Sequence, residues 1–552
     1  MPSKIKVDRQ VKIPMRDGIN LTADIYRPRG VDMPLPVLLM RLPYGRAIAS
    51  TVTYAHPSWY AAQGYIVVIQ DVRGCGTSEG EFYPFRHEYE DGYDTVTWCA
   101  ENLEGSNGKV GMYGFSYQGV TQLQAAVMQP RGLVTICPAM AGADLYDGWF
   151  YFGGAIALEF TLSWALQLTQ NQAYYRKLEP QSTNLWQAQQ EVSRSLSSVP
   201  LDQVPILKSD PLGQFFFDWL RNDQADAPYW QELNPLSRFA QFDLPALHIA
   251  GWADIFIETT IATYEAAKQV TNQPQFLIGS PWQHLPWRSQ VGELNFGDAA
   301  IPQIDQLQVD WFDYWLKGID NGMMGRSPVQ LFLMGENRWL NLKTWEQEPE
   351  YQNFYLDSNS KITTNTSDLL PSSLPDIYIY DPRIPTPSTS YGAYDQSAIN
   401  QRSDVLTYSS PPLTANLRIT GIAEFILYAE TSAPDTDWVV RLLDIYPDGR
   451  QMLVTMGVIR AKFRNAFKQT EILEPEIVLE YKIKLRPTCH SFELGHRLGI
   501  AIASAAFPLI ERHTNTAKSP STCTVSEFFE ATQQIYHDQQ FPSHLKLPLL
   551  KL

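Results

Sequence analysis

The chain contains 552 residues, which is long enough for two or three domains that each bury a hydrophobic core. Its formal charge of −16 argues against nucleic acid or an anionic membrane as a partner, because both are bound by basic patches. Aromatic residues make up 12% and charged residues 18%, a composition typical of a well-packed globular protein.

The sequence shows no sign of export or of a structural metal. Residues 1–10 lack the apolar core of a signal peptide, and no stretch approaches about 18 uninterrupted apolar residues, so a leader and a membrane span are not expected. The five cysteines are widely spaced and odd in number, which suggests neither a disulfide framework nor a zinc site. We therefore expect a cytoplasmic protein in a reducing environment.

The first part of the chain alternates short apolar strands with amphipathic helices. Strands are predicted at residues 36–42 and 65–71, and a helix at 90–102. Further buried strands are predicted at 244–251 and 275–279. Such alternation predicts a parallel α/β sheet covered on both faces, which we assign to residues 1–144 and 241–347.

Two regions depart from this pattern. Residues 145–240 are rich in aromatic, Gln, Leu and Ala residues and are predicted to form a mostly helical cap inserted over the sheet. Residues 348–552 show period-two alternation between turns, with strands predicted at 416–430, 438–446, 452–460, 477–485 and 497–504. This second pattern predicts an antiparallel sandwich or jelly roll. Residues 358–373 are predicted to be a polar loop.

A segment near residue 116 holds one serine between two glycines. Ser116 lies between Gly114 and Gly119, so the second glycine stands three places after the serine, not two as in Gly-x-Ser-x-Gly. An apolar strand at 110–113 precedes the serine, and a helix-compatible run through Val127 follows it. A strand-to-helix turn of this kind exposes the hydroxyl above the sheet edge, where acyl-transfer hydrolases keep their nucleophile.

Two later segments carry the residue types that such a serine needs. A serine hydroxyl requires a base in hydrogen-bond reach, and the base requires an orienting acid. Asp254 ends one apolar segment and His284 follows another, in the order Ser, Asp, His that α/β hydrolases use. The sequence therefore predicts a triad of Ser116, Asp254 and His284. His248 lies inside its strand, where we expect a core role.

Motifs along nearly the whole chain are similar to those of one family. They occupy residues 15–28, 41–45, 71–80, 91–94, 114–119, 251–254 (Gly-Trp-Ala-Asp), 281–284 (Pro-Trp-Gln-His) and 495–498 (Gly-His-Arg-Leu). On these motifs the chain resembles the cocaine-esterase-like serine hydrolases, relatives of X-prolyl dipeptidyl peptidases and α-amino acid ester hydrolases. Their serine turn shares the displaced glycine. The resemblance implies an α/β-hydrolase domain with a helical cap and a C-terminal jelly-roll domain.

The resemblance also implies a role for each site residue. Ser116 corresponds to the nucleophile, His284 to the general base and later acid, and Asp254 to the orienting carboxylate. The family's oxyanion hole corresponds to the backbone N–H of Tyr117 and the phenol of Tyr44. The histidine loop, Gly-Ser-Pro-Trp-Gln-His, is one residue longer than in most relatives, so we expect a small shift of His284.

The acyl group is predicted from the residues that follow the triad aspartate. Relatives that accept α-amino acyl groups bind the substrate ammonium with carboxylates, some of which lie where this chain has Ile255-Phe256-Ile257. Phe256, with Trp149 or Phe150 from the cap, resembles the aromatic acyl wall of the esterase branch. Apolar walls of this kind suit a neutral apolar or aromatic acyl group.

We therefore predict hydrolysis of a small-molecule carboxylic ester, or of an amide, through an acyl-enzyme on Ser116, without a metal or other cofactor. Asp144, Asp147 or Glu159 from the cap would suit an X-prolyl dipeptidyl-peptidase or an α-amino acid ester hydrolase or acylase, which is the alternative. A catalytically dead binding protein and a homo-oligomer also remain open at this point.

Overall fold

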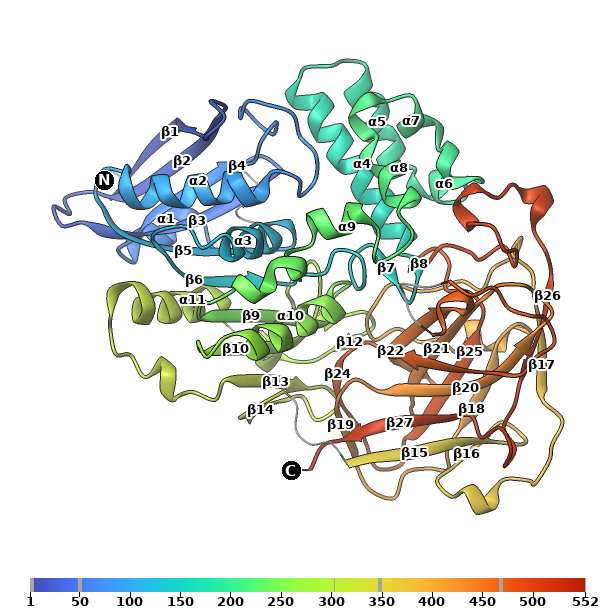
Figure 1. The fold of residues 1–552 in the computed structure, drawn as a ribbon. Coiled ribbons are helices and arrows are strands. Elements are labelled where there is room, and N and C mark those ends of the chain that lie inside the picture. Colours follow the sequence, from blue (N-terminus) through green and yellow to red (C-terminus); the bar gives the residue numbers. More distant parts are fainter. Residues whose placement is uncertain (1–3, 48–51, 302, 346–349, 466–469, 552) are drawn as a thin grey trace.

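A mixed sheet of ten strands forms the centre of the first domain in the computed structural model, which describes residues 4–47, 52–301, 303–345, 350–465 and 470–551 (Figure 1). The strand order is β1-β2-β4-β3-β5-β6-β9-β10-β13-β14. The strands from β4 to β13 in this order run parallel, and β1, β2 and β14 add antiparallel edges. The bounds are β1 Ile5–Pro14, β2 Asn20–Pro28, β3 Leu35–Leu42, β4 Ile66–Asp71, β5 Ser106–Phe115, β6 Leu133–Ala139, β9 Ala246–Ala253, β10 Gln275–Gln283, β13 Val329–Leu333 and β14 Arg338–Leu342.

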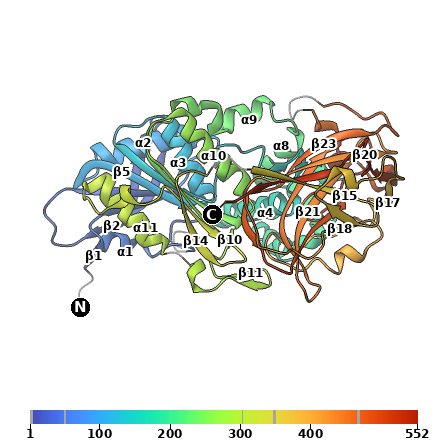
Figure 2. The same ribbon diagram turned by 90° about the horizontal axis from the view of Figure 1, so that it is seen from below.

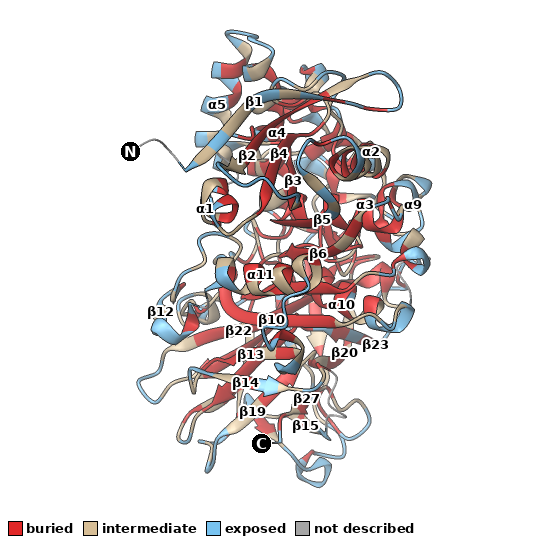
Figure 3. Ribbon diagram, turned by 90° about the vertical axis from the view of Figure 1, so that its left-hand side faces the viewer, coloured by how far each residue is buried: buried red, intermediate tan, exposed pale blue. Residues whose placement is uncertain are grey.

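Helices cover both faces of this sheet. Side chains of α1 (Pro57–Ala62) and α11 (Ile304–Phe312) pack on one face, and those of α2 (Glu88–Glu101), α3 (Tyr117–Val127) and α10 (Ile257–Val270) pack on the other. All residues of β4 and β9 are buried, as expected for parallel strands covered on both sides. Figure 3 shows the inner strands as the most completely buried part of the domain.

The cap between β6 and β9 is mostly helical, as predicted. Its helices are α4 (Leu158–Tyr175), α5 (Gln181–Gln190), α6 (Val192–Leu196), α7 (Pro205–Lys208), α8 (Phe215–Arg221) and α9 (Pro228–Leu233). A short hairpin of β7 (Tyr151–Phe152) and β8 (Ala155–Ile156) precedes them and was not predicted. The hairpin turn at Gly153 touches the C-terminal domain so closely that an added Cβ would lie 1.9 Å from the Val458 carbonyl oxygen.

The C-terminal domain is built from thirteen strands linked by hydrogen bonds, and it lies beside the sheet domain along the molecule (Figure 2). The bounds are β15 Glu350–Asp357, β16 Lys361–Thr363, β17 Asp376–Tyr380, β18 Leu406–Ser409, β19 Leu417–Gly421, β20 Glu424–Thr431, β21 Asp437–Ile445, β22 Gln451–Arg460, β23 Leu479–Lys484, β24 Thr488–Phe492, β25 Arg497–Ala503, β26 Ala531–Ile535 and β27 His544–Leu549. We call this domain the sandwich. The jelly-roll strand order stays a prediction.

Three predicted segments differ from the structure. The single strand expected at 416–430 is two strands, because the chain turns after Gly421, whose φ of 123° suits glycine. The polar loop expected at 358–373 contains the short strand β16, and β10 continues four residues beyond the predicted end at 279. The predicted domain boundary between residues 347 and 348 lies outside the described residues.

Candidate active site

Ser116 lies at a sharp turn between β5 and α3. β5 ends at Phe115 and α3 begins at Tyr117, and Ser116 between them has φ 60° and ψ −132°. This positive φ is strained for a residue with a side chain, as expected for a nucleophile elbow. The displaced Gly119 has a packing reason, because a Cβ there would lie 2.4 Å from the Ala141 Cβ. Glycine at this position therefore allows the first turn of α3 to approach the segment after β6.

The structure brings Asp254 and His284 together at the ends of two neighbouring parallel strands. Asp254 directly follows β9, His284 directly follows β10, and His284 Nδ1 lies 2.7 Å from Asp254 Oδ1. Asp254 is fully buried, whereas a quarter of the His284 side chain is exposed. A carboxylate on Nδ1 fixes the tautomer in which Nε2 accepts a proton. The imidazole lies beside the elbow, and its ring centroid is 5.5 Å from that of Phe115.

The end of β10 contains a bulge that can take up the extra loop residue implied by the family resemblance. The pairing of β10 with β9 shifts by one residue between Ser280, opposite Gly251, and Gln283, opposite Ala253. Such a bulge takes up one additional residue and re-aims the side chains that follow. His284 consequently keeps its contact with Asp254 despite the longer loop.

Two groups near Ser116 can donate hydrogen bonds to an oxyanion. Tyr117 is the first residue of α3, where backbone N–H groups have no partner within the helix and the helix dipole is positive. The Tyr44 phenol lies close to Ser116, and burial raises the pKa of Tyr44, so the phenol keeps its proton. The Tyr117 phenol is turned elsewhere, since it donates to Glu88 Oε1 at 2.9 Å.

The cap supplies a partner to Tyr44 that the sequence did not indicate. Trp164 Nε1, in the middle of α4, donates to the Tyr44 hydroxyl oxygen at 3.0 Å. The Trp164 indole is stacked on Trp219 at 5.5 Å and on Phe160 at 5.4 Å between ring centroids, so packing restrains its orientation. An indole donor on the phenol oxygen leaves the phenolic hydrogen free to point at another acceptor.

Aromatic rings lie beside His284. Phe256 lies edge to face with His284 at 5.0 Å, and Trp149 stacks on Phe256 at 3.8 Å with 9° between the planes. Phe150, also predicted for this wall, packs at 4.4 Å on Trp219 inside the cap core. The structure thus places Phe256 against His284, with Trp149 stacked on Phe256 and Phe150 in the cap core.

Two of the three acidic residues considered for an ammonium site, Asp144 and Asp147, line a separate cavity. Asp144, Asp147 and Glu258 line a cavity of about 120 Å³ whose described lining contains no triad residue. Burial and the neighbouring Glu258 raise the pKa of Asp147 to about 8, and burial raises the pKa of Glu258 to about 7. Glu159 begins α4, and burial raises the pKa of its carboxyl.

Other predictions concern metals, the core and the membrane. His248 is buried and lies 3.1 Å from Gln275 Oε1, and burial lowers its pKa to about 4, which confirms its core role. No group of three or more His, Cys, Asp or Glu that could hold a metal occurs in the described ranges, and the absence of a cofactor stays a prediction. Within the same ranges, no helix is long and apolar enough to span a membrane.

Comparisons with known proteins identify the family. The X-Pro dipeptidyl-peptidase (S15) family model matches residues 17–286, and the model of the X-Pro dipeptidyl-peptidase C-terminal non-catalytic domain matches residues 321–546. The cocaine esterase of Rhodococcus sp. (strain MB1 Bresler) is 33% identical over 99% of both chains. This chain belongs to the cocaine-esterase-like serine hydrolases of the S15 family. It is therefore an enzyme of the serine hydrolase class, as predicted.

Solved structures extend the likeness to the fold of this cocaine-esterase-like hydrolase. An α-amino acid ester hydrolase superposes with a TM-score of 0.81 at 26% identity, covering 99% of this chain and 97% of that chain. An aminopeptidase from a marine sediment archaeon (Thaumarchaeota archaeon) superposes with a TM-score of 0.83 at 24% identity, covering 100% and 98% of the two chains. The combination of α/β-hydrolase domain, cap and C-terminal β domain predicted from the sequence is confirmed.

Proposed function

We propose that Ser116 is the nucleophile of a carboxylic ester hydrolase that prefers apolar or aromatic acyl groups. Its oxygen attacks the ester carbonyl while His284 Nε2 takes the hydroxyl proton, and the resulting imidazolium gives that proton to the leaving alcohol. Water then attacks the acyl-enzyme with His284 again as the base, and the acid leaves as Ser116 regains its proton. The 2.7 Å contact between His284 and Asp254 supports this assignment, because a buried carboxylate stabilises the imidazolium.

The oxyanion of each tetrahedral intermediate is assigned to two donors. The Tyr117 backbone N–H lies at the positive end of α3, and the Tyr44 phenol lies beside Ser116. One preorganised donor of this kind lowers the barrier by about 3 kcal/mol. Trp164 is assigned a positioning role, because its indole holds the phenol oxygen of Tyr44.

The acyl preference rests on one observation, the stacked pair of Trp149 and Phe256 beside His284. An α-ammonium placed against these rings without a carboxylate would lose its hydration at a cost of several kcal/mol. The cocaine esterase of Rhodococcus, whose name describes an ester hydrolase, supports ester hydrolysis as the reaction. The S15 family description favours a second candidate, cleavage of X-Pro peptides.

A fluorophosphonate probe tests the nucleophile. We expect stoichiometric labelling at Ser116, located by peptide mass spectrometry, together with turnover of a short-chain nitrophenyl ester. Both should vanish in Ser116→Ala, whereas Ser280→Ala, which removes a buried serine bonded to the Ala300 carbonyl, should keep both. Labelling that persists in Ser116→Ala would overturn the assignment.

We also propose that the enzyme acts in the cytoplasm on small molecules. All five cysteines are buried free thiols, a state that suits a reducing compartment. The charge of −16 disfavours nucleic acid as a partner. Fractionation of the cells that produce the enzyme, with detection by the same fluorophosphonate probe, tests the location.

A further inference from the structure

Two contacts join the sandwich to the two segments that carry His284 and Asp254. Arg486, two residues after β23, donates from Nη2 to the main-chain carbonyl of Asp254. Gln283, immediately before His284, donates from Nε2 to the main-chain carbonyl of Tyr391 at 2.8 Å. The sandwich therefore contacts the main chain of Asp254 and the side chain of the residue that precedes His284.

Arg486 and Tyr391, the two sandwich residues, also contact each other. The Arg486 guanidinium carbon lies 3.8 Å from the centroid of the Tyr391 ring, a cation–π distance. Arg486 is 5% exposed and Tyr391 is 7% exposed, so water screens this contact little. The Arg486 main chain is fixed as well, because its N–H donates to the Met456 carbonyl at 3.0 Å and its carbonyl accepts from Thr455 Oγ1 at 2.8 Å.

The bond to Asp254 is one of the interactions that compensate the guanidinium. Arg486 Nε is buried and has no hydrogen-bond partner within the described part of the chain. Burying a cation is costly unless it is paired or hydrogen-bonded, and here the Asp254 carbonyl acts together with the Tyr391 ring and with Glu258, whose carboxyl interacts electrostatically with Arg486. The same bond that compensates Arg486 therefore restrains the Asp254 backbone.

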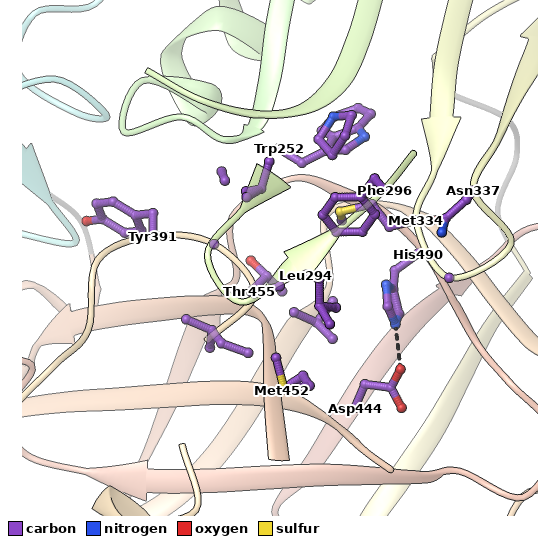
Figure 4. Close-up of a pocket in the computed structure, with 18 of the residues that line it drawn as sticks. Trp252, Leu294, Phe296, Met334, Asn337, Tyr391, Asp444, Met452, Thr455 and His490 are labelled. Atoms are coloured by element: carbon purple, nitrogen blue, oxygen red, sulfur yellow. Dashed lines mark hydrogen bonds and ion pairs between the residues drawn. The ribbon is translucent and has the colours of Figure 1, made fainter. Parts of the chain in front are cut away.

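A cavity lies beside these contacts, between the two domains. Its volume is about 130 Å³, and Figure 4 shows Trp252 from β9 on one side and Tyr391, Met452 and Thr455 from the sandwich on the other. Ala253, Pro281 and Arg486 also line it. Close packing is thus interrupted beside Ala253, the residue before Asp254.

We propose that Arg486 and Tyr391 form a clamp that positions the Asp254–His284 pair, so that the sandwich takes part in catalysis as a positioning unit. This inference rests on the roles proposed above for Asp254 and His284. Asp254 can orient the imidazole only if its own backbone is held, and a displacement of about 1 Å in such a pair can cost about 100-fold in rate. Arg486 and Tyr391 supply the restraint from outside the α/β domain.

The test compares two buried arginines of the sandwich in the full-length enzyme. In Arg486→Met we expect kcat for a nitrophenyl ester to fall about 10- to 100-fold while KM changes less than about twofold. The downfield proton resonance of the His284–Asp254 hydrogen bond should shift or broaden. Arg486→Lys, which keeps a donor, should recover part of the loss. The control is Arg441→Met, because Arg441 in β21 is equally buried and donates to the Pro387 and Ala505 carbonyls within the sandwich.

We expect Arg441→Met to keep the wild-type kcat and resonance, whatever its thermal stability. Wild-type kcat and an unchanged resonance in folded Arg486→Met would overturn the clamp. If Arg486→Met does not fold, Tyr391→Leu and Arg486→Lys decide the question by the same two readouts. Failure of the proposed function looks different, because wild-type enzyme would then not be labelled at Ser116 at all.

Discussion

At the scale of single residues, the site depends on where a few protons point. His284 Nδ1 lies against Asp254, and in the proposed mechanism Nε2 takes the proton of Ser116. In the same way, Trp164 occupies the Tyr44 oxygen and leaves the phenolic hydrogen for the oxyanion. Both arrangements reduce the reorganisation needed as charge develops, which is how preorganised donors accelerate acyl transfer.

The role of Trp164 can be tested by removing only its N–H. Trp164→Phe should lower kcat about three- to tenfold with little change in KM, because one hydrogen bond worth about 1 kcal/mol is lost. The matched control is Trp219→Phe, since Trp219 stacks on Trp164 but its Nε1 has no partner among the described residues. Equal effects of the two substitutions on kcat would show that the Trp164 indole acts through packing and not through its hydrogen bond to Tyr44.

At the scale of secondary-structure elements, the elbow joins β5 to α3 at a position where the helix approaches its neighbours closely. Gly119→Ala would place a Cβ 2.4 Å from the Ala141 Cβ and 3.3 Å from the Ala139 oxygen. We expect this change to lower the free energy of unfolding by about 1–3 kcal/mol. Gly325→Ala is the control, because no atom lies within 4 Å of its added Cβ, and thermal unfolding of both variants measures the difference. Equal unfolding temperatures would contradict the packing explanation.

The start of α10 carries a pH dependence of stability. Burial raises the pKa of Glu258 to about 7 and that of Asp147 to about 8, above the ordinary range of carboxyl groups. At these two carboxyls the folded state binds more protons than the unfolded state, so their contribution to stability falls as the pH rises from about 5 to 8. Glu258→Gln should flatten this dependence of the unfolding temperature, and Glu232→Gln, at an exposed position in α9, should leave it unchanged. A pH dependence of the unfolding temperature that is the same in Glu258→Gln as in the wild type would contradict the account.

The three candidate site residues could be predicted from the sequence, whereas their hydrogen-bond partners far along the chain could not. Ser116, Asp254 and His284 each follow a strand, and strand ends are local features of residue pattern. By contrast, the bond between Trp164 and Tyr44 spans 120 residues, and that between Arg486 and Asp254 spans 232. No periodicity connects such positions, because they meet only after the cap and the sandwich pack on the sheet. The division of residues 416–430 into two strands depended likewise on one backbone angle at Gly421.

At the scale of the whole molecule, three parts meet around the triad. The sheet supplies Ser116, Asp254 and His284, the cap supplies Trp149 and Trp164, and the sandwich supplies Arg486 and Tyr391. The sandwich matches a domain described as non-catalytic, yet its contacts reach Asp254 and the residue that precedes His284. On this account the active site is complete only when all three parts are docked.

The most direct test of the proposed function compares two esters that differ only by an α-ammonium. We predict that kcat/KM for the nitrophenyl ester of 3-phenylpropanoic acid exceeds that for the nitrophenyl ester of phenylalanine by about 100-fold or more, after the Ser116→Ala rate is subtracted. The stacked Trp149 and Phe256 favour the neutral acyl chain and offer no charge to an ammonium. Faster hydrolysis of the phenylalanine ester would contradict the account and move the enzyme to the amino-acyl branch of its family.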